Sequence, residues 1–129
     1  MTTATPHHTV RAIFVSFATA GVLTLGVAGQ AWAHAHPVHE TPAPGATVAA
    51  PEQVRISYDN PLESAFSHLT VRNAEGKPVN RAKSSVEGRS RKIMRVALPA
   101  LSAGKYEVRW VAVADDGHRT QGHYTFTVK

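Results

Sequence analysis

Apolar and polar residues alternate in short runs from Val54 to the C-terminus of this chain. The clearest runs are residues 54–58, 69–72, 106–110 and 124–128. Strict alternation is typical of β-strands that bury one face, and no comparable stretch beyond the N-terminal region has apolar residues at helical spacing. Turn-forming residues such as Asp115-Asp116-Gly117 separate the runs. The pattern therefore predicts an all-β domain with the form of a β-sandwich.

Aromatic residues take alternate positions in two of these runs. Tyr106 and Trp110 share one run, and Phe126 lies in the last. We interpret them as core residues rather than as a ligand-stacking surface, because aromatic residues at such positions supply much of a small sandwich's buried area. The proline-containing segment 40–51 predicts an extended stretch that leads into the first long strand.

The N-terminal region has the three parts of a secretory signal peptide. Arg11 gives a positive charge, residues 12–29 contain no charged side chain, and Ala31-Trp32-Ala33 places small residues before a cut. We expect residues 1–33 to be removed and residues 34–129 to form the exported domain of 129 − 33 = 96 residues. A second site, Ala33-His34-Ala35, would move the cut to before His36. A transmembrane anchor is the other alternative, since ~18 apolar residues is the lower limit of spanning length.

Charge and cysteine content narrow the classes of function. The whole chain has 14 Lys and Arg against 9 Asp and Glu, and loss of Arg11 leaves 13 − 9 = +4. The basic residues are scattered, so we expect a solvated surface and no binding of nucleic acid. Cysteine is absent, so the domain has no disulfide, and any metal site in it lacks thiolate ligands.

Two groups of histidines are candidate metal ligands. A cut before His34 would place an α-amino group beside that residue's imidazole, and both can bind one ion. Asp116 and His118 flank Gly117, which permits a tight turn that directs both side chains to one point. Three nitrogens and one oxygen suit Cu(II). An ordinary turn with a solvated Asp-His pair is the alternative for this loop.

The remaining histidines have other interpretations. His36 at the third position after the cut allows an amine-amide-amide-imidazole chelate at the chain end, which competes with the first set. We expect His39 to be solvated or an additional weak ligand. His68 and His123 lie in or beside predicted strands and are interpreted as ordinary surface or edge residues.

The order and spacing of several short motifs resemble the CopC family of copper-resistance proteins over nearly all of residues 34–129. The motifs are His34-Ala35-His36, Thr41-Pro42-Ala43-Pro44-Gly45-Ala46, Ser57-Tyr58-Asp59-Asn60-Pro61, Leu98-Pro99-Ala100-Leu101, Gly104-Lys105-Tyr106-Glu107-Val108-Arg109-Trp110 and Asp116-Gly117-His118. The resemblance implies a single Greek-key β-sandwich or barrel, cupredoxin-like or immunoglobulin-like. It implies a periplasmic protein that binds one Cu(II) through His34, Asp116 and His118.

The resemblance also implies what the protein does with the ion. We expect a monomer without enzyme activity that serves copper resistance, buffering or delivery, with an inner-membrane copper transporter as partner. Some family members hold Cu(I) in a methionine-rich segment, whereas this chain has only Met1 and Met94. Some carry a glutamate near the metal where this chain has Asp59 and Asn60, so a role of these two residues at the site stays open.

Two other classes of function remain as alternatives. Copper-dependent oxidative enzymes also use an N-terminal histidine chelate, but they need an open coordination position and a broad substrate surface. A metal-free interaction sandwich would carry its histidines incidentally. Oxygen consumption with copper and a reductant identifies the first class, and a copper titration of the correctly cleaved protein identifies the second.

The exported protein should begin at His34, because Ala31 and Ala33 fit the small-residue pockets of signal peptidase. Intact-mass spectrometry of the exported protein measures this start directly. A chain that stays uncleaved, or that begins well beyond His36, would remove the proposed N-terminal ligand.

Overall fold

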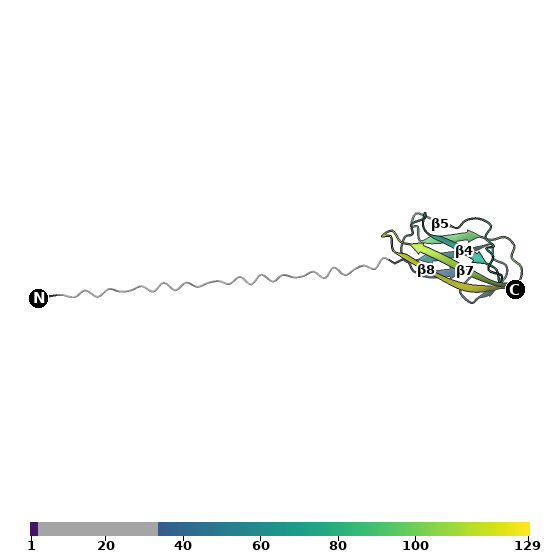
Figure 1. The fold of residues 1–129 in the computed structure, drawn as a ribbon, viewed down its shortest axis with the longest axis horizontal. Helices are drawn as coiled ribbons and strands as arrows, with labels where there is room; N and C mark the ends of the chain where they lie inside the picture. The colour runs from purple at the N-terminus through teal and green to yellow at the C-terminus, as the bar shows by residue number, and fades with distance from the viewer. Residues whose placement is uncertain (3–33) are drawn as a thin grey trace. The chain divides into compact units, whose positions relative to one another are not determined.

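Eight β-strands in two sheets make up the part of the chain that the computed structural model describes, residues 1–2 and 34–129 (Figure 1). Apart from Met1 and Thr2, the predicted signal peptide lies outside the described residues. No helix that is long and apolar enough to cross a bilayer occurs in the described ranges. The strands are β1 (Pro37–Thr41), β2 (Thr47–Val48), β3 (Gln53–Tyr58), β4 (His68–Arg72), β5 (Ser85–Glu87), β6 (Ile93–Ala97), β7 (Gly104–Val113) and β8 (Arg119–Val128).

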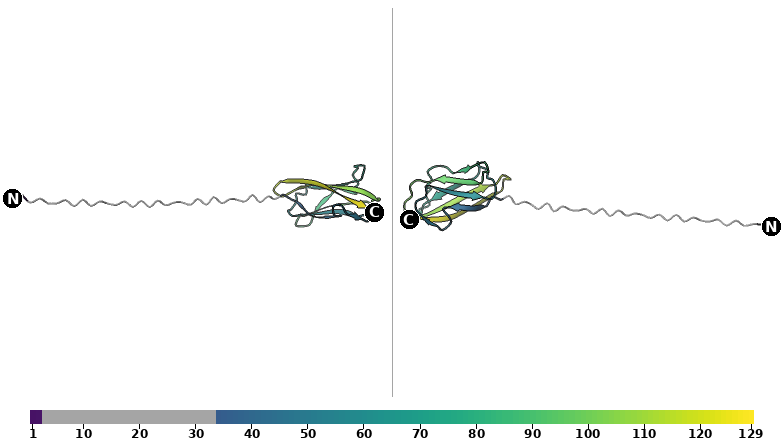
Figure 2. Two further views of the ribbon diagram at one scale, coloured as in Figure 1. Left: turned by 90° about the horizontal axis from the view of Figure 1, so that it is seen from below. Right: turned by 180° about the vertical axis from the view of Figure 1, so that it is seen from behind.

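The two sheets each contain four strands, in the orders β1-β3-β6-β5 and β2-β8-β7-β4. Strands β7 and β8 form a long antiparallel hairpin, and only the short β2 pairs in parallel, with β8. The chain crosses from one sheet to the other after β1, β2, β3, β4 and β6, and the two layers are visible in Figure 2. These Greek-key-like connections confirm the predicted all-β sandwich.

The predicted alternation places one face of each long strand in the core. Val54, Ile56 and Tyr58 of β3 are buried, as are the alternate residues of β7 and β8. The rings of Tyr106 and Phe126 stack with their centroids 5.6 Å apart, which confirms their predicted place in the core.

Trp110 is partly buried and packs against this core. Its ring meets that of Tyr58 edge-on across the two sheets, at a centroid distance of 5.8 Å. Aromatic pairs prefer such edge-to-face contacts, because the ring edge is positive and the face negative. The contact therefore joins β7 of one sheet to β3 of the other.

The first strand begins earlier in the chain than the alternation predicted. The end of β1 and all of β2 lie in segment 40–51, which is therefore paired with its neighbours and is more than a lead-in. The pairing of β1 with β3 shifts register at Val38. The two-residue step from Pro37 to His39 in β1 lies opposite a single-residue step in β3. Met94 and Val96 of β6 also alternate with a polar residue, Arg95, but the predicted runs did not include this strand.

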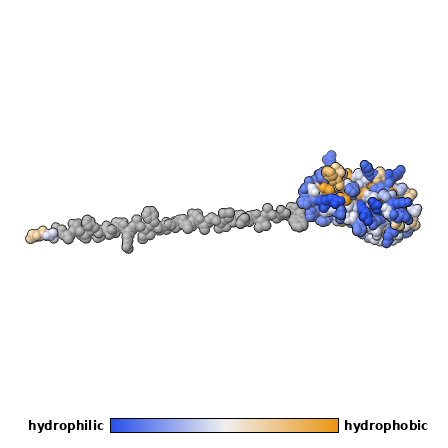
Figure 3. Space-filling view, in the orientation of Figure 1, coloured by the Kyte–Doolittle hydropathy of each residue, from blue (hydrophilic) through white to orange (hydrophobic). Residues whose placement is uncertain are grey.

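Few large apolar side chains are left in contact with solvent. Among residues 34–129, Val38 and Phe66 are the large hydrophobic residues that remain exposed. Figure 3 shows one face of the domain, which is mostly hydrophilic with a small apolar area. Within residues 34–129, most large apolar side chains are thus buried in the core or packed against it.

Gly122 lies directly under the indole of Trp110, and this contact generates a stability prediction. A Cβ at position 122 would sit 2.7 Å from Cζ2 of Trp110, so Gly122→Ala must displace the indole. We expect it to lower the free energy of unfolding by about 1–3 kcal/mol, the usual effect of overpacking. Urea denaturation measures the loss.

A Trp110→Phe background provides the control for this prediction. Phenylalanine lacks the atoms that a residue-122 Cβ would strike, so Gly122→Ala should there have a much smaller effect. Equal losses in both backgrounds would show that the glycine acts through something other than the indole.

Candidate metal centre

Backbone and side-chain hydrogen bonds hold residues 34–36 against the turn that follows β3. The His36 amide donates to Oδ1 of Asp59 over 2.7 Å, and the Asp59 amide donates to the His36 carbonyl over 3.1 Å. Nδ2 of Asn60 donates to the His34 carbonyl over 3.0 Å. Asp59 and Asn60 thus position the N-terminal segment, which gives these two residues a role that the sequence left open.

The opposite sheet holds the same segment from the other side. Ala35 is fully buried in the core cluster. The hydroxyl of Thr120, the second residue of β8, donates to the Ala35 carbonyl over 2.6 Å. Residues 34–36 are therefore fastened to both layers of the sandwich.

A tight turn brings the second group of candidate ligands to the same end of the domain. Residues 114–118 connect β7 to β8, and the Ala114 amide donates to the His118 carbonyl over 2.9 Å. Gly117 has φ +85°, a left-handed conformation that favours glycine. This backbone explains why a glycine separates Asp116 from His118.

Asp116 and His118 form a hydrogen-bonded pair. Oδ1 of Asp116 accepts from the His118 amide over 3.0 Å, and Oδ2 lies 2.7 Å from Nδ1 of the ring. The backbone hydrogen bond, with the side-chain bond and the nearby His34, lowers the pKa of Asp116. An ionised carboxylate only accepts hydrogen bonds, so Nδ1 carries a proton and Nε2 of a neutral His118 keeps its lone pair.

The turn places His118 beside His34. Their ring centroids are 5.0 Å apart, and the ring of His36 lies 5.9 Å from that of His34. Residues 34–129 nevertheless contain no ready-made group of three acidic or histidine side chains that would hold a metal ion. Both oxygens of Asp116 point at His118 instead, so the structure brings the three predicted residues together without joining them around one point.

Three of the other histidines, His39, His68 and His123, lie in strands. His68 and His123 are exposed residues of β4 and β8, as expected of surface positions. His39, on β1, has its Nε2 3.3 Å from the Thr41 hydroxyl. His36 is exposed at the site, but its backbone amide is engaged by Asp59.

Sequence reasoning missed the residues that build the support of the site. Thr120 carries no motif that would mark it, since its role arises from contact with a residue 85 positions away. Asn60 was noted only as a departure from a family pattern, although a side-chain amide after a strand is a frequent backbone partner.

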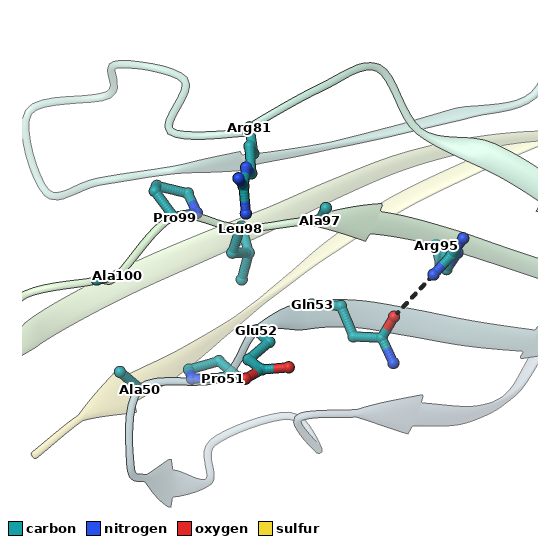
Figure 4. A pocket seen from close by; sticks show the side chains of 10 residues that line it. All are labelled: Ala50, Pro51, Glu52, Gln53, Arg81, Arg95, Ala97, Leu98, Pro99 and Ala100. Carbon is teal, nitrogen blue, oxygen red and sulfur yellow. Dashed lines mark hydrogen bonds between the residues drawn. The ribbon is translucent and has the colours of Figure 1, made fainter.

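A hollow lies at the other end of β3 and is separate from the histidines (Figure 4). Its lining residues are Ala50, Pro51, Glu52, Gln53, Arg81, Arg95, Ala97, Leu98, Pro99 and Ala100. Arg95 donates to Oε1 of Gln53 across it over 3.4 Å. With neither histidine nor a group of carboxylates in its lining, it offers no ligand set comparable to that of the other end.

Comparison with known proteins identifies close relatives of this sequence. The family model described as the CopC domain matches residues 37–129. "Protein YobA" of Escherichia coli (strain K12) is 35% identical over 115 residues, covering 88% of this chain and 93% of that protein. "Copper resistance protein C" of Escherichia coli is 38% identical over 117 residues, covering 84% of this chain and 92% of that protein.

A solved structure has the same fold. The crystal structure of PcoC, described as a methionine-rich copper resistance protein from Escherichia coli, matches with a TM-score of 0.67 and 34% identity. The match covers 75% of this chain and 100% of that one. The fold described above is therefore found in an experimentally determined relative.

Removing the hydroxyl of Thr120 should loosen the N-terminal segment. Thr120→Val keeps the shape of the side chain but leaves the buried Ala35 carbonyl without this donor, which should lower the free energy of unfolding by about 1–3 kcal/mol. Denaturant unfolding measures the change. Thr120→Ser keeps the hydroxyl and should lose much less, and equal losses in both variants would contradict a role for this hydrogen bond.

Proposed function

The chain belongs to the CopC family, and we propose that it is an exported copper-binding protein that holds one Cu(II) ion through His34, Asp116 and His118. The observation that carries the proposal is the approach of His34 to His118, two residues 84 positions apart whose rings are 5.0 Å from each other. Imidazole nitrogens with a carboxylate oxygen are a donor set that suits Cu(II). A copper-related function also agrees with the name of the copper resistance relative.

Processing would complete the ligand set. A cut before His34 turns its backbone nitrogen into an amine, which gives up a proton to a metal far more readily than a peptide nitrogen does. The amine and imidazole of His34 then supply two nitrogens, and Nε2 of His118 supplies the third.

Asp116 would supply the oxygen by changing partner. Its Oδ1 stays on the His118 amide, whereas Oδ2 leaves Nδ1 of the ring for the ion. The retained backbone bond keeps the carboxylate beside the imidazole during this exchange. The lowered pKa of Asp116 means that no proton has to be removed from it at neutral pH.

The structure favours this set over the chain-end chelate of His36. That chelate requires the His36 backbone nitrogen to lose its proton and bind copper. The same nitrogen donates to Asp59 over 2.7 Å, and the neighbouring Ala35 is buried and held by Thr120. Forming the chelate would break these contacts, whereas the His34 and His118 set preserves them.

Copper would be held as Cu(II) rather than as Cu(I) on thioethers. The structurally similar PcoC is described as methionine-rich, but this chain has only Met1 and Met94. Met94 lies fully buried in the core. A thioether site for Cu(I) therefore has no basis in the exported domain.

The proposed role is to buffer copper in the periplasm or to pass it on, with an inner-membrane copper transporter as recipient. His118 and Asp116 are exposed, so a partner can reach the ion directly. The domain would act as a monomer without enzyme activity and without nucleic acid. Oxygen consumption by the copper-loaded protein with a reductant would identify an oxidative enzyme instead, and absence of Cu(II) binding would favour a metal-free interaction domain.

An initiator Met retained before His34 should weaken Cu(II) binding at least ~100-fold, a loss of ~2.7 kcal/mol or more. The extension leaves every imidazole in place but converts the His34 amine into an amide. Titration against a competing chelator measures the affinity, and fluorescence of Trp110 follows it, because the other tryptophan, Trp32, precedes the cut. Equal binding by the extended and cleaved proteins would show that the free terminus is not a ligand.

Matched histidine variants in the cleaved protein locate the second half of the site. His118→Ala should weaken binding by at least about tenfold, whereas His123→Ala, at an exposed position of β8, should change it less than about twofold. Asp116→Asn should have a smaller effect than His118→Ala, because the amide keeps an oxygen donor. Near-full affinity in His36→Ala would separate this site from the chain-end chelate.

A further inference from the structure

Arg91 has an unusual backbone conformation beside the candidate copper site. It lies between β5 and β6 and has φ +51°. Every other described residue with a positive φ is a glycine. A positive φ in a non-glycine residue persists only where the surroundings enforce it, and such residues gather at functional sites. The Arg91 carbonyl accepts from the Leu62 amide over 2.8 Å, which holds the residue against the loop after β3.

The guanidinium of Arg91 bridges the loop after β3 and the β7–β8 turn, two segments that also meet through the backbone pairing of Leu62 with Ala114. Its Nη1 donates to the Leu62 carbonyl over 3.3 Å and to Oε1 of Glu63 over 3.2 Å. Its Nη2 donates to Oδ2 of Asp115 over 2.7 Å. Arg91 therefore connects the loop after β3 to the residue directly before Asp116.

Stability of the fold is a weak explanation for this arrangement. The side chains of Arg91, Glu63 and Asp115 are 42%, 41% and 45% exposed. Ion pairs with this exposure contribute little to folding, because water screens them and long side chains lose freedom. Because these ion pairs contribute so little to folding, an arginine held at positive φ indicates a role in positioning its partners rather than in stability.

Asp115 and Asp116 are adjacent carboxylates, and each has a separate partner. Asp115 is held by Arg91 and Asp116 by His118. Without Arg91, the Asp115 carboxylate would lose its cationic partner and would be able to compete with Asp116 for an ion beside His118, because the two residues share one exposed turn. Which of the two carboxylates reaches the ion therefore depends on Arg91, which holds Asp115.

We propose that Arg91 is a positioning residue of the copper site, which holds Asp115 away from the ion and fixes the turn so that Asp116 accompanies His118. The proposal rests on the proposed Cu(II) site. Arg91 itself contacts no ligand in this scheme. Its contribution is to let one of two neighbouring carboxylates reach the metal and to keep the turn in a single conformation.

The first test uses the cleaved protein without metal. Arg91→Gln removes the charge and the forked donor, so the amides of Ala114 and His118, both hydrogen-bonded within the turn, should exchange with solvent at least about tenfold faster. Arg95→Gln is the matched control, since Arg95 on β6 has an exposed ion pair with Glu87 and lies away from the turn. Equal exchange in the two variants would overturn the proposal whether or not the protein binds copper.

The second test adds one equivalent of Cu(II) and records the electron paramagnetic resonance spectrum. Wild type and Arg91→Gln/Asp115→Asn should each show one species, because in neither can Asp115 replace Asp116 as the carboxylate ligand. Arg91→Gln alone should show two species and bind about tenfold more weakly. A purely structural arginine would lower the unfolding midpoint and leave the spectrum and affinity of Arg91→Gln equal to those of Arg95→Gln, which would overturn the proposal.

Failure of the proposed function is distinguishable from failure of this inference. If the cleaved wild type binds no Cu(II), the copper site is wrong, and the exchange test alone decides whether Arg91 positions the turn. Arg91→Gly separates backbone from side chain, because glycine accepts positive φ without strain. It should fold at least as stably as Arg91→Gln and show the same two copper species, and a single species there would overturn the assignment to the guanidinium.

Discussion

The burial of Ala35 is the constraint on which the rest of this arrangement depends. A small side chain at this position enters the core between the sheets, and the Thr120 hydroxyl meets its carbonyl there. The residues on either side must then emerge at the same end of the sandwich, where Asp59 and Asn60 hold their backbone groups. If the predicted cut before His34 is made, both sheets would fasten the new N-terminus, which would ordinarily fray.

The long β7–β8 hairpin supplies the other half of the candidate site, the turn with Asp116 and His118. Its ten-residue strands pair along their full length, so the turn at 114–118 projects from a rigid support. A site on a supported turn can keep its donors in place while remaining exposed. Such exposure would suit the proposed exchange of copper with a partner.

Electrostatics at this end of the domain are arranged in pairs rather than as one charged cluster. Arg91 forms ion pairs with both Asp115 and Glu63, while Asp116 is paired with His118. Each of these three carboxylates therefore has a partner within the protein. In the proposed Cu(II) site, Asp116 would have to exchange its hydrogen bond to the His118 ring for a bond to the ion.

The amino-acid sequence by itself determined the class of fold, because period-2 alternation leaves a chain no other way to bury its apolar residues. It also indicated His34, Asp116 and His118 as candidate ligands, from local spacing and a predicted cleavage site. The pairing of β1 with β3, the tether from Thr120 to Ala35 and the link from Arg91 to Asp115 were decided only by the tertiary structure. Each joins residues far apart in the chain, and no local preference encodes a contact that exists only after the two sheets have packed.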